Sequence, residues 1–376
     1  MMTSPSGRVI RVAALAAVLA ASLHVVARPV TLGASVAPRP APALPERLSD
    51  TEFWTLLSDI SEPGGFFRIT DNFTSNEGEI GRIFTRIRQE GPKGGVYIGV
   101  GPEQNFTYIA AVRPAMAFII DIRRQAVVQH LMFKAMFELS KDRADFISLL
   151  FSKPRPPGLD AATSVQKLWE SFMATPTDQT AAAKNSAKVT EHLTKTHKFT
   201  LAAEEADQLA YLLQAFVGFG PGISTRGGGG GGGGSQTFAD LTGWATDDLG
   251  QPQSFLSTED NFRAVKALHD KNLIVPVSGD FGGPKALRAI GTYLQKQGGT
   301  VSAFYVSNVE QYLFQDGKDR AFYANVGTLP INPSTVFIRP YSLRRGNQPL
   351  CPIGAFLGAV TAGRIFSNTD ALVCSR

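Results

Sequence analysis

The sequence predicts an α/β fold: a Rossmann-like, mostly parallel, doubly wound sheet with a helical insertion. Short apolar runs have the length and composition of buried parallel strands, and they lie at 96–100, 117–120, 273–277, 300–306 and 335–339. Segments with apolar residues three and four positions apart separate several of these runs and predict amphipathic helices. Glycines and polar residues directly follow the runs, which is where parallel sheets bind ligands.

Composition limits the classes of partner. Of the 376 residues, 43% are hydrophobic and 18% are charged, which is typical of a folded globular protein of one to three domains. The net charge is +5, and the basic residues are scattered without a run of five or more. We therefore expect a small-molecule ligand and no nucleic-acid partner. The composition does not indicate an oligomeric state.

The first 47 residues predict export. Arg8 and Arg11 precede the apolar run from Val12 to Val26, and a small-residue cleavage pattern ends at Ala27, so residues 1–27 are a predicted signal peptide. The run is shorter than the about 20 residues of a membrane span, although an uncleaved anchor is an alternative. Residues 28–47 are rich in Pro and Ala and predict a linker. We expect a periplasmic or extracellular protein without membrane contact after signal removal, or a cytoplasmic protein if the signal is not real.

A single domain is expected over residues 48–376, and its first part alternates helices and strands. Phe53, Leu57 and Ile60 share one helical face, and Ser49 or Asp50 can cap that helix. The expected elements are helices at 51–60 and 80–88, a strand at 96–100, a helix at 106–112, a strand at 117–120 ending at Asp121, and a helix at 124–140. Short strand–helix–strand connections are right-handed and build a parallel sheet.

A helical insertion is expected at about 150–236, after the proline-rich segment 153–157. It contains helical segments near 162–174 and 202–216, followed by eight consecutive glycines at 227–234. Because glycine loses the most conformational freedom on folding, we expect a surface loop there and no phosphate site. The α/β pattern then resumes with helices at 258–269 and 284–297 between the remaining strands.

The predicted binding site follows the first two strands. Gly99 and Gly101 let the backbone bend close to a ligand, and the next helix begins there. Asp121 lies 20 residues after Gly101, at the end of the next strand, where a carboxylate can bind both hydroxyls of a ribose. Arg123 and Arg124 adjoin it and keep NADP as an alternative. The simpler interpretation of the glycines is a tight turn.

The residues after this bend favour an adenosyl ligand without phosphates. A dinucleotide fingerprint would place glycine at position 104, where this chain has Gln104. Glu103 would repel a pyrophosphate, but not the sulfonium and ammonium groups of S-adenosylmethionine. We therefore expect Glu103 and Asn105 near the methionine part of that cofactor, and we prefer it to NAD.

Other polar residues lie after later strands or in loops. Asp280 and Asn308 are the predicted catalytic residues beside an acceptor, although each, like Glu310, could instead cap a helix. The polar segment 71–77 could form a lid over the pocket or a solvated loop. His130 is expected to be a packed helix residue.

The cysteines and histidines predict no metal site. Cys351 and Cys374 are 23 residues apart and could form a disulfide in an exported protein or remain free thiols. The five histidines are scattered, and neither HxxxH nor CxxC spacing occurs, so we expect no zinc.

Four blocks resemble an uncharacterised bacterial protein family that is grouped by fold with the class I S-adenosylmethionine-dependent methyltransferases. They are GVGPEQNFTYIA (99–110), FIIDIRRQ (118–125), SGDFGG (278–283) and FYVSNVEQYL (304–313). The resemblance covers roughly residues 48–355 and implies a Rossmann-like fold with Asp121 as the ribose-binding acid. Tyr97 stands where methyltransferases have an acidic residue, and Glu103 stands where they have a third glycine.

The resemblance implies a methyltransferase-like protein that binds S-adenosylmethionine, with an acceptor that the sequence does not identify. Export conflicts with this function, because S-adenosylmethionine is a cytoplasmic metabolite. The alternatives are a non-catalytic exported binding protein for a nucleoside-like or other small polar ligand, and an NAD(P)-dependent oxidoreductase.

Overall fold

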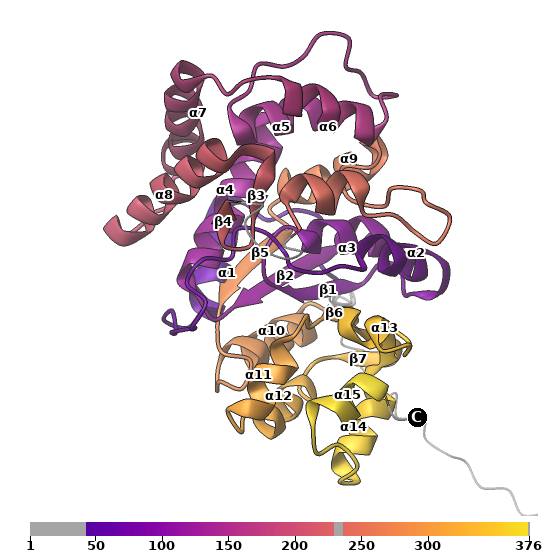
Figure 1. The fold of residues 1–376 in the computed structure, drawn as a ribbon. Helices are drawn as coiled ribbons and strands as arrows, with labels where there is room; N and C mark the ends of the chain where they lie inside the picture. Colours follow the sequence, from indigo (N-terminus) through magenta and orange to yellow (C-terminus); the bar gives the residue numbers. More distant parts are fainter. Residues whose placement is uncertain (1–42, 229–235, 375–376) are drawn as a thin grey trace, which may run out of the picture. The chain divides into compact units, whose positions relative to one another are not determined.

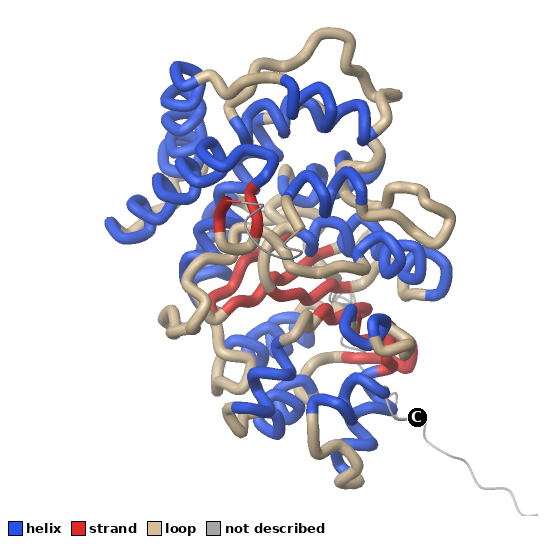
Figure 2. Tube along the Cα trace, in the orientation of Figure 1, coloured by secondary structure: helices blue, strands red, loops and turns tan. Residues whose placement is uncertain are grey.

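The computed structural model describes residues 43–228 and 236–374 and has the predicted mixed α/β fold (Figure 1). Six strands form one sheet in the order β5-β2-β1-β6-β7-β8, at the centre of Figure 2. They are β1 (Val96–Val100), β2 (Met116–Asp121), β5 (Ile274–Ser278), β6 (Val301–Tyr305), β7 (Ile331–Ile338) and β8 (Leu350–Pro352). All neighbouring pairs are parallel except β7 and β8. The first five strands have the Rossmann order 3-2-1-4-5, and the antiparallel sixth strand departs from the classic dinucleotide-binding sheet.

The described residues begin at position 43, inside the predicted linker. The predicted signal peptide and most of the predicted linker lie outside the described residues. Leu44 already packs against the core, and the Arg47 guanidinium donates to the carbonyl of Asp270 at 2.5 Å. Within the described part of the chain, no helix has the length and apolar character that a membrane crossing requires.

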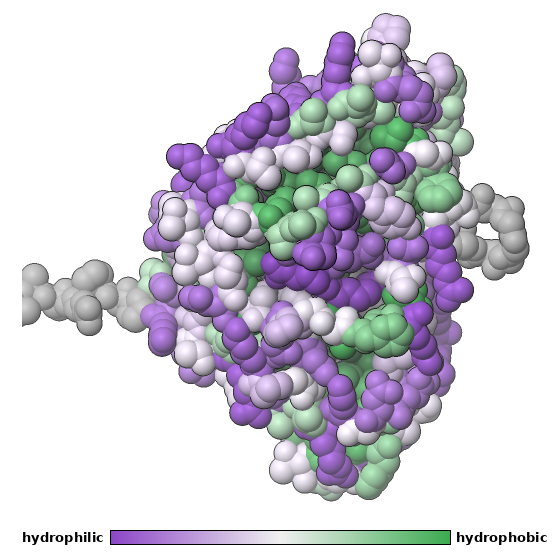
Figure 3. Space-filling view, turned by 90° about the vertical axis from the view of Figure 1, so that its left-hand side faces the viewer, coloured by the Kyte–Doolittle hydropathy of each residue, from purple (hydrophilic) through white to green (hydrophobic). Residues whose placement is uncertain are grey.

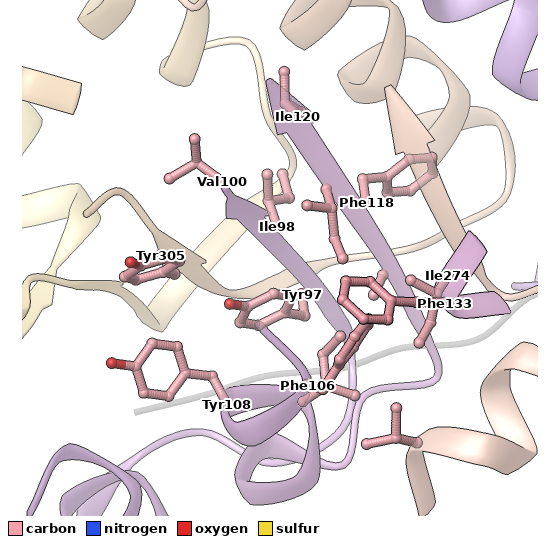
Figure 4. Packing of buried hydrophobic residues seen from close by; sticks show 14 of the residues in the cluster. Tyr97, Ile98, Val100, Phe106, Tyr108, Phe118, Ile120, Phe133, Ile274 and Tyr305 are labelled. Carbon is pink, nitrogen blue, oxygen red and sulfur yellow. The ribbon is translucent and has the colours of Figure 1, made fainter. Parts of the chain in front are cut away.

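The two faces of the sheet pack against different helices. Ile98 and Phe118 point to one face, and Tyr97 points to the other, where Phe106 and Tyr108 of α3 (Gln104–Val112) lie (Figure 4). All five side chains are buried. This burial explains why the strands are continuous apolar runs in the sequence.

Helices before β5 in the chain pack mainly on one face, and helices after β5 pack on the other (Figure 1). The first group comprises α2 (Ile80–Glu90), α3, α4 (Arg124–Leu139) and α9 (Glu259–His269). The second comprises α10 (Ala286–Lys296), α12 (Asp319–Val326) and α14 (Ile353–Thr361). Helix α1 (Asp50–Ile60) contacts β5 and α10, and Ser49 and Glu52 form its capping box.

The helical insertion contains more elements than the sequence predicted. They are α5 (Arg143–Phe151), α6 (Val165–Ala174), α7 (Gln179–Glu191), the π-helical turn η1 (His192–Thr196), α8 (Ala203–Phe219), the 3-10 turn η2 (Gly220–Gly222) and the π-helical turn η3 (Asp240–Trp244). The sequence indicated only α6 and α8. The first two glycines of the glycine run form β4 (Gly227–Gly228), which is antiparallel to β3 (Ile223–Ser224). Residues 229–234, for which a surface loop is predicted, lie outside the described residues.

The C-terminal segment closes the edge of the sheet and contains the disulfide. Helix α15 (Asn368–Val373) contacts both α11 (Val309–Gln315) and α13 (Pro340–Arg344), and α11 also contacts α12. Cys351 of β8 is bonded to Cys374, with a Cα–Cα distance of 5.7 Å. Of the two alternatives for the cysteines, the structure therefore has the disulfide.

Candidate functional site

A cavity that opens to solvent lies at the carboxyl ends of the parallel strands. Its walls include Gly101 after β1, Asp121 at the end of β2 and Asp280 after β5, while Asn72 and Asn76 belong to the segment predicted as a lid or a solvated loop. The cavity spans the position between β1 and β6 where the strand order reverses, which is the usual ligand site of such sheets. Figure 3 shows hydrophilic residues across the middle of this side of the molecule, with apolar patches above and below.

Buried side chains hold the bend after β1. Gly101 has a φ of +77°, which glycine adopts without strain. The Asn105 amide donates hydrogen bonds of 2.7 to 3.1 Å to the carbonyls of Val100, Gly101 and Pro102. His130 Nε2 donates to the Gly101 carbonyl at 2.8 Å, and burial lowers the pKa of His130 to about 4, so the ring is neutral near pH 7. His130 is thus a packed helix residue, as expected, that also braces the bend.

Asp121 lines the same cavity as Gly101. The register pairs Val100 with Ile120, so Gly101 and Asp121 lie at the same level of two neighbouring strands. Such strands are about 4.8 Å apart, so a ligand the size of a ribose can contact both residues. The Asp121 carboxylate is 8% exposed and accepts three hydrogen bonds of 2.8 to 3.0 Å from Arg123. This ion pair was not predicted.

Three of the predicted cofactor contacts lie behind the wall of the cavity, namely Gly99, Glu103 and Asn105. A methyl group on Gly99 would overlap the Asn105 side chain and the Tyr97 ring. Both Glu103 carboxyl oxygens face the N–H of Ser75, at 3.1 and 3.2 Å. Burial raises the pKa of Glu103 to about 8, so this group is mostly neutral at pH 7. A neutral Glu103 does not repel a pyrophosphate, so the expected repulsion has no physical basis.

Asp280 and Asn308, the predicted catalytic residues, both line the cavity. Lys318 Nζ lies 2.6 Å from Asp280 Oδ2, and the Gly282 N–H donates to Asp280 Oδ1 at 2.9 Å. Neither predicted residue caps a helix through its side chain: Glu62 accepts from the N–H of Ala286 at the start of α10, and Asn308 makes no cap bond to α11. Both side chains therefore remain available to the cavity, although Asp280 is paired.

Sequence reasoning missed a polar network at the base of the cavity. Gln104 and Tyr305 line the cavity, and the Gln104 amide donates to the Tyr305 hydroxyl. Tyr305 and Ser307 in turn donate to the buried Glu77 at 2.7 and 2.6 Å, and burial raises the pKa of Glu77. Among the described atoms, Gln104 Oε1 is buried without a hydrogen-bond partner and can accept from a ligand. Glu77 and Tyr305 are 228 residues apart, so no local pattern could have revealed their contact.

Comparison with known proteins gives one family match. A family model described as "Domain of unknown function (DUF7790)" matches residues 72–214 and 239–349. No curated protein sequence matches the chain. The matched segments contain Gly101, Asp121, Asp280 and Asn308, whereas the unmatched residues 215–238 contain the glycine run.

Proposed function

The chain belongs to the DUF7790 family, a domain of unknown function, and we propose that its cavity binds S-adenosylmethionine as part of a methyltransferase-like activity. The observation that carries the proposal is the placement of Gly101 and Asp121 at one level of neighbouring strands. A ribose held there can donate a hydroxyl to Asp121. Arg123 takes three of the roughly four acceptor positions of this carboxylate and leaves one for the ligand.

The charges around the cavity support a ligand without phosphates. Arg123 is paired with Asp121, and Lys318 is paired with Asp280, so both cationic side chains of the described lining already have carboxylate partners. Arg124, which could have favoured NADP, is paired with Glu205 at 2.5 Å. The carboxylate partners already neutralise these cations and weaken their attraction for a pyrophosphate, whereas binding of a sulfonium or ammonium group does not depend on them.

The proposed activity is transfer of a methyl group to an acceptor beside Asp280 and Asn308. In such a reaction the protein mainly aligns the acceptor with the methyl group, and a carboxylate can remove a proton from the acceptor. Asp280 would first have to separate from Lys318 to serve as that base. Asn308 can orient an acceptor through its amide.

A second candidate function is ligand binding without catalysis in an exported protein. The disulfide between Cys351 and Cys374 favours it, because disulfides form and persist mainly in oxidising compartments. The predicted signal peptide points the same way, and S-adenosylmethionine is a cytoplasmic metabolite. In this candidate the cavity holds a nucleoside-like or other small polar ligand. An NAD(P)-dependent oxidoreductase has less support because the lining cations are paired.

Thermal-shift measurements with S-adenosylmethionine, S-adenosylhomocysteine, adenosine, NAD and NADP test these candidates. A ligand at 100 times its Kd stabilises the native state by about 2.7 kcal/mol and therefore raises Tm. We expect a response to the first two compounds, and its loss in both Asp121→Ala and the less disruptive Asp121→Asn. Asp248→Ala is the matched control, because Asp248 is exposed and pairs with Arg82 outside the cavity.

The pattern of responses separates the candidates. A rise in Tm with adenosine alone, in a chain whose mature N-terminus shows signal cleavage, would replace the methyltransferase with the exported binding protein. A response to NAD alone would indicate an oxidoreductase. Equal responses of the wild type and both Asp121 variants would remove Asp121 from the site.

A further inference from the structure

Three metal-ligating side chains meet away from the cavity, where the insertion packs against α4. Glu138 lies near the end of α4, His192 begins η1, and His197 directly follows η1. Glu138 Oε2 is 2.9 Å from Nε2 of His192 and 2.7 Å from Nε2 of His197. One ligand atom from each residue lies within 4.8 Å of the other two. The three side chains are 10 to 17% exposed, so water can reach the cluster although it is sheltered.

The π-helical turn brings the two histidines onto one carboxylate. The N–H of His197 donates to the carbonyl of His192 at 3.0 Å, which is the i to i+5 hydrogen bond of a π-helix. In an α-helix, residues on the same face are three or four positions apart, so two histidines five apart predict no site. Single π turns are rare and occur frequently at functional sites.

A second carboxylate orients one of the rings. His197 Nδ1 lies 2.7 Å from Asp50 Oδ1, and Asn272 donates to the same oxygen at 2.9 Å. Metal-binding histidines commonly bond a carboxylate through their other nitrogen, which fixes the ring. The ring of His197 also stacks on Phe199, with centroids 4.9 Å apart. His197 is therefore held in an orientation that presents Nε2 to the cluster.

The charge of the cluster suits a divalent cation. Lys134 Nζ lies 2.6 Å from Glu138 Oε1, the oxygen that faces away from the histidines, and this leaves Oε2 for a metal. With neutral imidazoles, the carboxylates of Glu138 and Asp50 and the ammonium of Lys134 sum to one negative charge. A cation at Oε2 would therefore meet a net negative environment despite the lysine.

We propose that Glu138, His192 and His197 bind a divalent transition-metal ion, for which Zn²⁺ is the best-fitting common candidate. Two imidazoles and one carboxylate form a known zinc ligand set, in which water completes the tetrahedron. Bonds of about 2.0 to 2.2 Å place tetrahedral ligand atoms about 3.3 Å apart, so the present separations need to widen by about half an ångström. The ion would fasten η1, and with it α7, to α4.

Equilibrium dialysis of the chelator-treated full chain against ZnCl₂, followed by metal analysis, tests the site. We expect one Zn²⁺ per chain and a rise in Tm on binding. His192→Gln and His197→Gln should each weaken binding on the order of 100-fold or more, because each removes a ligand. Asp50→Asn keeps all three ligands and should weaken binding roughly 10- to 100-fold.

Lys195→Ala is the matched control, because Lys195 lies in the same turn with its side chain 73% exposed. Its Zn²⁺ affinity should equal that of the wild type. His130 and His269 stay in every variant, so they contribute the same background, and circular dichroism checks that each variant is folded. Substoichiometric uptake by the wild type, or unchanged affinity in both histidine variants, would overturn the proposal and identify the cluster as an ion-pair network.

Discussion

Glu103 and Glu77 are two buried carboxyl groups behind the polar base of the cavity. They are connected through Ser75, whose N–H faces Glu103 and whose hydroxyl accepts from the N–H of Glu77 at 3.1 Å. Burial raises the pKa of both groups, because a charged carboxylate loses its hydration there. The loop that carries Asn72 and Asn76 is therefore anchored by groups whose protonation depends on folding.

Replacement of Glu103 by Gln should remove a pH dependence of stability. The pKa of Glu103 is about 8 in the folded state and about 4.5 in the unfolded chain. Between these pH values the folded state keeps a proton that the unfolded chain loses. The free energy of unfolding should therefore fall as pH rises from about 4.5 to 8, by up to about 1.4 kcal/mol per pH unit from this group. Urea unfolding at pH 5, 6.5 and 8 measures the slope, which should be smaller in Glu103→Gln.

The control for this experiment is Glu170→Gln, which changes an exposed glutamate of α6. It should keep the wild-type slope. Parallel pH profiles for Glu103→Gln and the wild type would contradict the assignment, because the buried carboxyl group would then not retain its proton on folding.

At the scale of elements, β1 and the start of α3 form one unit that shapes the cavity. Asn105 on α3 donates to three carbonyls of the connecting bend, and Tyr97 on β1 donates to Asn105 Oδ1 at 2.9 Å. Gly99 leaves the space in which these two side chains meet. The glycine that sequence analysis placed against a ligand is thus needed for packing between the strand and the helix.

Gly99→Ala should therefore destabilise the protein and disturb the bend. Overpacking of a close-packed interior typically costs about 1 to 3 kcal/mol. Gly358→Ala is the matched control, because Gly358 lies in the interior of α14 and no atoms lie within 4 Å of an added methyl group. That variant should be more stable by about 0.4 to 1 kcal/mol. Urea denaturation of both compares the unfolding free energies, and equal stability of the two variants would show that the space at Gly99 is not required.

The predicted and observed elements agree where local sequence patterns are strong and differ where tertiary contacts decide the structure. Apolar runs located β1, β2, β5, β6 and β7, because strands buried on both faces leave a strong local signal. The residues Gly101, Asp121, Asp280 and Asn308 were correctly placed at one edge by the same argument. The inward direction of Glu103 and Asn105 and the pairing of Arg123 depend on side-chain packing, which local patterns do not contain. The short strand β8 and the π turn η1 likewise depend on tertiary contacts.

At the scale of the whole described domain, a long chain segment separates β2 and β5, which are neighbouring strands of the sheet. The chain leaves the sheet after β2, forms the insertion and α9, and returns as β5, whose Ser278 pairs with Asp121. The cavity therefore combines residues that are far apart in the chain, such as Asp121 and Asp280. The sequence accordingly predicts the next strand after Asp121 only at 273–277, because the insertion precedes it.

The disulfide also connects parts of the domain that are distant in the chain, because it links the last strand to the end of the last helix. Cys351 is buried in the edge strand β8 beside Phe337 of β7, and Cys374 follows α15, so the bond fastens the C-terminal helices to the sheet. Closing a chain loop of 23 residues should stabilise the fold by about 3 kcal/mol, because the closed loop restricts the conformations of the unfolded state.

Dithiothreitol should therefore lower the urea midpoint of the wild type. In the double variant Cys351→Ala and Cys374→Ala, the midpoint should already be low and should not respond to the reductant. If the wild-type midpoint is unchanged although alkylation and mass spectrometry show both thiols reduced, the bond does not stabilise the fold, and packing of α14 on β7 alone holds the edge of the sheet.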